Sequence, residues 1–102
     1  MGYARPRPKK LAYKLKQIRL ALGLSQTEMY RQLAVEDQIP YTRISKYELD
    51  ENEPPLLILL QYARVAGVHM EDIVDDSVSL PNKLPGPVTQ ASPKRRSASK
   101  ST

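Results

Sequence analysis

The chain has 102 residues, enough for one small domain with a single core. It contains no cysteine, which excludes disulfides, thiol nucleophiles and thiolate metal sites. The longest apolar run, residues 56–60, is too short to span a bilayer. The first ten residues are basic and contain proline, unlike a signal peptide. We therefore expect a cytoplasmic protein with no membrane partner.

The net charge of +5 is distributed unevenly along the chain. Residues 11–76 hold seven basic residues and all eleven acidic ones, so the middle of the chain is net negative. The excess positive charge lies in residues 1–10 and 77–102, which are also rich in proline. Such segments bury too little apolar surface to offset the entropy of ordering. We therefore expect a disordered basic arm over 1–10 and a disordered basic tail over 77–102.

The start of the middle region predicts two helices joined by a sharp turn. Apolar residues recur at helical spacing over 11–22, and Gly23 is a typical residue just after a helix end. Ser25 and Glu28 have the spacing of a capping box, in which each side chain accepts a hydrogen bond from the backbone of the other. This pattern predicts a second, short helix from 26 to about 34.

The rest of the middle region predicts a loop and three further helices. Residues 35–40 carry an acidic pair and a proline, which are typical of a loop. A third helix is expected over about 42–49. The proline pair at 54–55 marks the start of a fourth helix, and Gly67 marks its end. A fifth helix is expected over about 70–75. The fold class is therefore all-α, a compact five-helix domain over residues 11–76.

Several short motifs occur in a fixed order within this domain. Residues 18–26 read IRLALGLSQ, and residues 44–48 read ISKYE. Ala66-Gly67-Val68 and Asp72-Ile73 follow at matching distances. This ordered set resembles the Cro/repressor family of helix-turn-helix proteins, also called Xre-like. The resemblance implies a phage-repressor-like fold for residues 11–76.

The resemblance also implies that Arg19 and Glu48 form a largely buried ion pair between the first and third helices. A guanidinium offers a two-pronged donor, and a buried carboxylate needs such a partner. The alternative is two solvated surface charges. In either case the role of these residues is structural, and we expect no catalytic residue, metal ligand or cofactor.

DNA-contacting positions follow from the same resemblance. Gln26, at the start of the second helix, corresponds to a glutamine that contacts phosphate, and helix N-termini favour anions. Lys46 and Arg43 have the chemistry to reach guanine acceptors. The alternative is that these are ordinary solvated residues on a helix face. The candidate DNA-binding residues are Gln26, Tyr41, Thr42, Arg43, Ser45 and Lys46.

The sequence departs from the family pattern in four respects. The loop between the second and third helices is longer than usual, so residues 35–38 are expected to bulge out. Tyr30 replaces a small residue, and Asp50 replaces the glycine that closes the third helix. Glu51 and Glu53 add acidic charge to a loop that often approaches phosphate in the family.

Two functions therefore remain open. The first is a sequence-specific DNA-binding transcriptional regulator that inserts its third helix in the major groove of double-stranded DNA. The second is a protein-interaction module or antitoxin-like adaptor that has this fold and reads few bases. A homodimer and a protein partner both stay open. The chain is not expected to be an enzyme, because its single histidine, His69, has no cysteine partner and is interpreted as a surface or capping residue.

Overall fold

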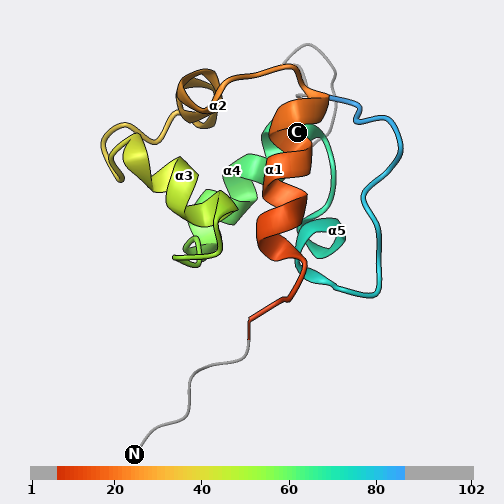
Figure 1. The fold of residues 1–102 in the computed structure, drawn as a ribbon. Coiled ribbons are helices and arrows are strands. Elements are labelled where there is room, and N and C mark those ends of the chain that lie inside the picture. The colour runs from red at the N-terminus through yellow and green to blue at the C-terminus, as the bar shows by residue number, and fades with distance from the viewer. Residues whose placement is uncertain (1–6, 87–102) are drawn as a thin grey trace, which may run out of the picture.

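The computed structural model describes residues 7–86. These residues form five helices, and no strand occurs among them, which confirms the predicted all-α fold (Figure 1). The remainder of the predicted basic arm and tail, residues 1–6 and 87–102, lies outside this range. The helices are α1 (Leu11–Ala21), α2 (Gln26–Leu33), α3 (Thr42–Glu48), α4 (Leu56–Ala66) and α5 (Met70–Val74).

Local sequence signals set the turn between α1 and α2. Gly23 has a φ of +73°, the left-handed conformation that closes a helix and that glycine adopts without steric cost. The predicted capping box is present. The Glu28 backbone N–H donates to Ser25 Oγ at 3.1 Å, and the Ser25 N–H donates to Glu28 Oε1 at 2.8 Å. The hydrogen bond from the Ser25 backbone N–H also lowers the pKa of the Glu28 carboxyl.

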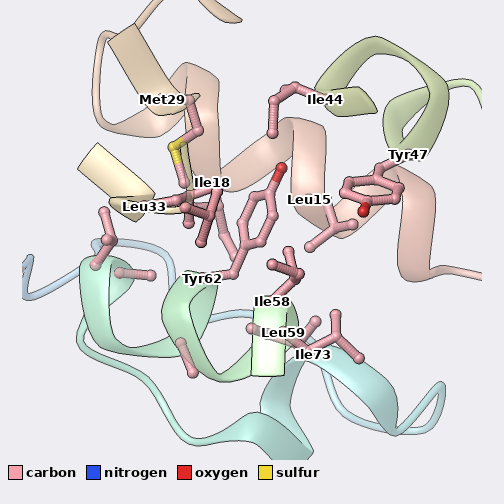
Figure 2. Close-up of a cluster of buried hydrophobic side chains, with 14 of the residues drawn as sticks. Leu15, Ile18, Met29, Leu33, Ile44, Tyr47, Ile58, Leu59, Tyr62 and Ile73 are labelled. Carbon is pink, nitrogen blue, oxygen red and sulfur yellow. The ribbon is translucent and has the colours of Figure 1, made fainter. Parts of the chain in front are cut away.

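The helices pack around one apolar core. Figure 2 shows the Tyr62 ring extending from α4 into the cluster of buried side chains, which includes Leu15 of α1, Met29 of α2 and Ile44 of α3. Its hydroxyl is buried and has no hydrogen-bond partner within residues 7–86, and burial raises its pKa. The fully buried large side chains are Leu15, Ile18, Met29, Leu33, Val35, Ile44, Ile58, Tyr62 and Ile73.

The connection between α2 and α3 is an irregular loop over residues 34–41, which confirms the predicted loop. The expected outward bulge of residues 35–38 is only partly correct, because Val35 is fully buried in the core while Glu36 and Asp37 are exposed. A branched apolar side chain at the start of the loop gains more from burial than from solvent exposure. The longer loop is thus anchored to the domain at its first residues.

Residues 77–86, which the sequence assigns to the tail, lie against the helices. They form no helix, and they run from the end of α5 back along the outside of the domain (Figure 1). Leu80 and Leu84 pack against the core as partly buried side chains. The Gly86 N–H donates to the Ala66 carbonyl at 3.0 Å, and a side chain at Gly67 would collide with the Gly86 carbonyl. The packed unit therefore extends to at least residue 86.

One buried lysine joins this segment to α1. Lys14 is 2% exposed, and its ammonium donates to the carbonyl oxygens of Asp72, Asp75 and Val78 at 2.8, 2.8 and 2.6 Å. All three of its N–H donors are therefore used. Asp76 makes a second connection, because its carboxylate accepts hydrogen bonds from the backbone N–H groups just before α1.

The longest helices, α1 and α4, have 11 residues each. Within residues 7–86, no helix combines the length and the apolar character that crossing a membrane would require.

Candidate nucleic-acid interface

A shallow groove lies between the first turn of α2 and the exposed face of α3. It has a volume of about 550 Å³. Four lining residues carry hydroxyl groups, and the others carry an amide, an ammonium and a carboxylate. Five of the six predicted DNA-binding residues line it. The lining residues are Gln26, Thr27, Tyr41, Thr42, Ser45, Lys46 and Glu51.

The helical repeat of α3 places its polar residues on the side of the helix that lines the groove. Thr42, Ser45 and Lys46 are spaced three and four residues apart, so they share one face of the helix. Ile44 and Tyr47 lie on the opposite face and are buried in the core. Burial of these two apolar residues fixes the rotation of α3 and thereby presents the polar face outward.

Arg43, the sixth predicted residue, lies apart from the groove. Its side chain is half-buried, and Nη1 donates to Asn52 Oδ1 at 3.1 Å. The guanidinium therefore contacts the loop after α3, while the neighbouring Thr42 faces the groove. A side chain one position along a helix points about 100° away.

Arg19 and Glu48 lie in contact beneath the groove. Arg19 Nε donates to Glu48 Oε2 at 2.7 Å, and Nη2 donates to Glu48 Oε1 at 3.0 Å. The side chains are 12% and 3% exposed. The hydrogen bond with Glu48 raises the pKa of the Arg19 guanidinium. A bidentate pair of this kind holds α1 and α3 in one relative orientation.

Gln26 belongs both to this buried network and to the groove. Its Nε2 donates to Glu48 Oε1 at 3.2 Å, and its side chain also lines the groove. Arg19 Nη1 donates to the Leu24 carbonyl at 3.0 Å, just before α2 begins. The first turn of α2 is therefore tied to α3 through the same carboxylate that holds Arg19.

Tyr30 is a site residue that the sequence did not identify as functional. Its hydroxyl donates to the Ile39 carbonyl at 2.6 Å, within the loop that precedes α3. Its ring meets the Tyr41 ring edge-on, with centroids 6.4 Å apart. The large ring thus braces the exposed Tyr41 at the rim of the groove. The available signal was the co-occurrence of a large residue in α2 with a longer following loop.

Acidic residues also reach this surface. Asp50 adopts a φ of 61°, the left-handed conformation expected where the family has glycine. The next residue, Glu51, lines the groove, and its Oε1 lies 3.8 Å from Lys46 Nζ. The groove therefore combines a cation with a carboxylate instead of forming a uniformly positive surface.

A sequence model of the helix-turn-helix family, Cro/C1 or Xre-like type, matches residues 15–73, more than half of the chain. Comparisons with curated proteins and with solved structures gave no match. The matched segment contains both helices that line the groove and the Arg19–Glu48 pair beneath it. The chain therefore belongs to the Cro/repressor-type helix-turn-helix family, a family of DNA-binding regulators.

Proposed function

We propose that this protein is a sequence-specific DNA-binding transcriptional regulator that places α3 in the major groove of double-stranded DNA. The observation that carries the proposal is the groove itself, where residues from α2 and α3 present hydrogen-bonding groups on one surface. A major groove admits a helix and offers a distinct donor and acceptor pattern for each base pair.

Within this proposal, α3 supplies the base contacts. Lys46 is half-exposed and can donate to the guanine O6 and N7 acceptors. Thr42 and Ser45 lie on the same face and carry hydroxyls that can bond either bases or phosphates. Tyr41, at the rim of the groove, is held by the Tyr30 ring and can contact the base edges beside those that α3 contacts.

The first turn of α2 supplies the phosphate contact. The capping box uses the backbone N–H groups of Ser25 and Glu28. The amides of Gln26 and Thr27 have no acceptor in the first turn of a helix, so they can donate to a phosphate oxygen. The bond from Gln26 to Glu48 orders this turn before DNA arrives.

The basic ends of the chain supply affinity for DNA phosphate that does not depend on the base sequence. Residues 87–102 contain four basic residues and no acidic residue. Each phosphate neutralised by lysine or arginine contributes a slope of about −0.9 in log affinity against log salt. Replacing Lys94, Arg95 and Arg96 by glutamine should therefore flatten the salt dependence and weaken binding to every sequence alike.

The test begins by selecting bound sequences from a random DNA pool with the full chain. Lys46→Ala and Thr42→Ala should then reduce the preference for selected over scrambled duplexes, by about 1–3 kcal/mol for a good base contact. Lys16→Ala, an exposed residue of α1 outside the groove, is the control and should leave the preference unchanged. A palindromic selected site with paired half-sites would indicate that two copies bind together.

The second candidate is a protein-interaction module or antitoxin-like adaptor. The observation that favours it is the carboxylate of Glu51 in the groove, where a phosphate-binding surface would be basic. If the full chain shows no sequence preference at any salt concentration, the regulator proposal fails and this reading replaces it.

A further inference from the structure

The loop after α3 contacts two cations, Arg7 from the segment before α1 and Lys46 from α3. Arg7 Nη2 donates to the Asp50 carbonyl at 3.3 Å and lies 3.6 Å from Asp50 Oδ1. Lys46 Nζ lies 3.8 Å from Glu51 Oε1, and both residues line the groove. Two adjacent carboxylates therefore each contact a cation, one from the segment before α1 and one from α3.

Asn52, the next residue of the loop, also contacts a cation, but through a neutral amide oxygen. Asn52 Oδ1 accepts from Arg43 Nη1 at 3.1 Å. Both basic residues of α3, Arg43 and Lys46, thus face acceptors of the same loop. We call residues 50–52 the acceptor loop.

Backbone hydrogen bonds keep the acceptor loop beneath the last turn of α3. The Asp50 N–H donates to the Tyr47 carbonyl at 3.3 Å, and the Glu51 N–H donates to the Lys46 carbonyl at 2.9 Å. With Asp50 in the left-handed conformation, this is the Schellman arrangement that closes a helix. The loop side chains consequently stay close to the cations of α3.

A carboxylate and a phosphate compete for the same cation. Both present anionic oxygens, so the Lys46 ammonium held by Glu51 must leave that carboxylate before it can bind either a phosphate or a guanine closely, and this cost is the same for both acceptors. After the exchange, the released carboxylate lies near the DNA backbone and repels it. Neither effect depends on which base pairs the duplex contains, so both should lower affinity for every sequence alike.

We propose that the acceptor loop is an internal competitor of DNA for the two cations that its carboxylates contact. The inference rests on the proposed function. The loop lowers affinity for every duplex by a similar factor, because its carboxylates oppose the phosphate backbone and not a particular base. Stable binding then depends on base contacts by α3 and on the basic ends of the chain.

The experiment compares two full-length double variants that each remove two negative charges. Asp50→Asn/Glu51→Gln neutralises the acceptor loop, and asparagine tolerates the left-handed conformation at position 50. Glu36→Gln/Asp37→Asn is the matched control, because these exposed residues lie in the α2–α3 loop and do not line the groove. Binding is measured on selected and scrambled duplexes across a range of salt concentrations, with thermal midpoints to verify folding.

The loop variant should bind both duplexes more tightly, on the order of tenfold at low salt, since two exposed ion pairs no longer compete. Its salt dependence should steepen by about 1–2 units of slope as freed cations contact phosphates. The control should change affinity by less than about threefold, because its charges are exposed, do not line the groove and are screened by salt. The ratio between selected and scrambled duplexes should stay unchanged in both.

Equal changes in the two variants would overturn the inference, because net charge alone would then explain them. An unchanged or weaker affinity of the loop variant would also overturn it while leaving the proposed function intact, provided that the unmodified chain prefers its selected site. If neither the unmodified chain nor the variants bind any duplex, the proposed function fails and the inference fails with it.

Discussion

Two cations of α1 are buried five residues apart and are stabilised in different ways. Arg19 pairs with the carboxylate of Glu48 beneath the groove, so its charge is met by an opposite charge. Lys14, at the other end of the domain, donates to three backbone carbonyls, and within residues 7–86 no carboxylate accepts from its ammonium. Two of these carbonyls belong to the end of α5, where the helix dipole favours a cation.

The two kinds of partner, a carboxylate and backbone carbonyls, predict different costs when the cation is replaced. Removing one member of an ion pair leaves a buried charge without a partner, which is costly. Removing the Lys14 side-chain charge leaves three neutral carbonyls without a donor and takes a nearby positive charge from the Asp75 and Asp76 carboxylates, which keep other hydrogen-bond donors. This costs less than a buried charge that has lost its partner. The pair beneath the groove should therefore be more sensitive to substitution than the lysine that joins α1 to α5, although Lys14 is the more deeply buried of the two cations.

The largest effect is expected when the ion pair is broken. Glu48→Gln and Arg19→Met should each lower the free energy of unfolding by about 3–5 kcal/mol, the range for a buried pair that loses one partner. Replacing both residues by apolar ones should cost less than the sum of the single changes, because no charge is then left unpaired. Urea unfolding of the singles and the double checks this. Unmoved midpoints in both single variants would show that the pair contributes little.

A smaller effect is expected at the lysine. Lys14→Met keeps most of the apolar stem and removes the ammonium, so the free energy of unfolding should fall by about 1–3 kcal/mol. Lys16→Met on the same helix is the control, because Lys16 is exposed and surface changes usually stay within about 0.5 kcal/mol. A loss at Lys14 as large as that at Arg19 would contradict the distinction between charged and neutral partners.

The smallest effect concerns Asp76, which joins the same end of the domain to α1. Backbone hydrogen bonds from Lys10 and Lys9 hold the pKa of this carboxyl below its ordinary value of 3.8. Because the folded pKa is the lower one, the stabilisation is fully present above the ordinary pKa and is lost as pH falls through the folded value.

Asp76→Asn should therefore lower the urea midpoint slightly at neutral pH, and the difference from the unmodified chain should vanish in strong acid. Urea titrations at a series of pH values down to about 2 would follow it. A difference that persists at the lowest pH would mean that the carboxylate charge is not the source of the stabilisation.

The groove side of the molecule was largely predictable. The capping box of Ser25 and Glu28 and the left-handed Gly23 depend on residues close in sequence, so short motifs reveal them. The alternation of Thr42, Ser45 and Lys46 with buried Ile44 follows from the helical repeat. The hydrogen bond from Arg43 to Asn52 could not be predicted, because it depends on the backbone of the loop after α3.

The opposite end of the domain was less predictable. Lys14 lies on the apolar face of α1. A charged residue at such a position indicates that a buried partner exists, but the sequence does not identify that partner. Its three acceptors are 58 to 64 residues away in the chain. Residues 77–86 are rich in proline, which predicts a tail, yet Leu80 and Leu84 pack against the core. The composition of a segment does not show whether single leucines such as Leu80 and Leu84 pack against the core.

By itself, the sequence determined the five helices, the capping box of α2 and the family, because hydrogen bonds within helices and apolar periodicity act over three or four residues. Only the tertiary structure decided which acceptors hold Lys14, how Tyr30 braces Tyr41, and that the acceptor loop meets the cations of α3. These contacts depend on how packed helices bring distant side chains together. The core sets those positions, since helices that bury their apolar faces against one another have few relative orientations available.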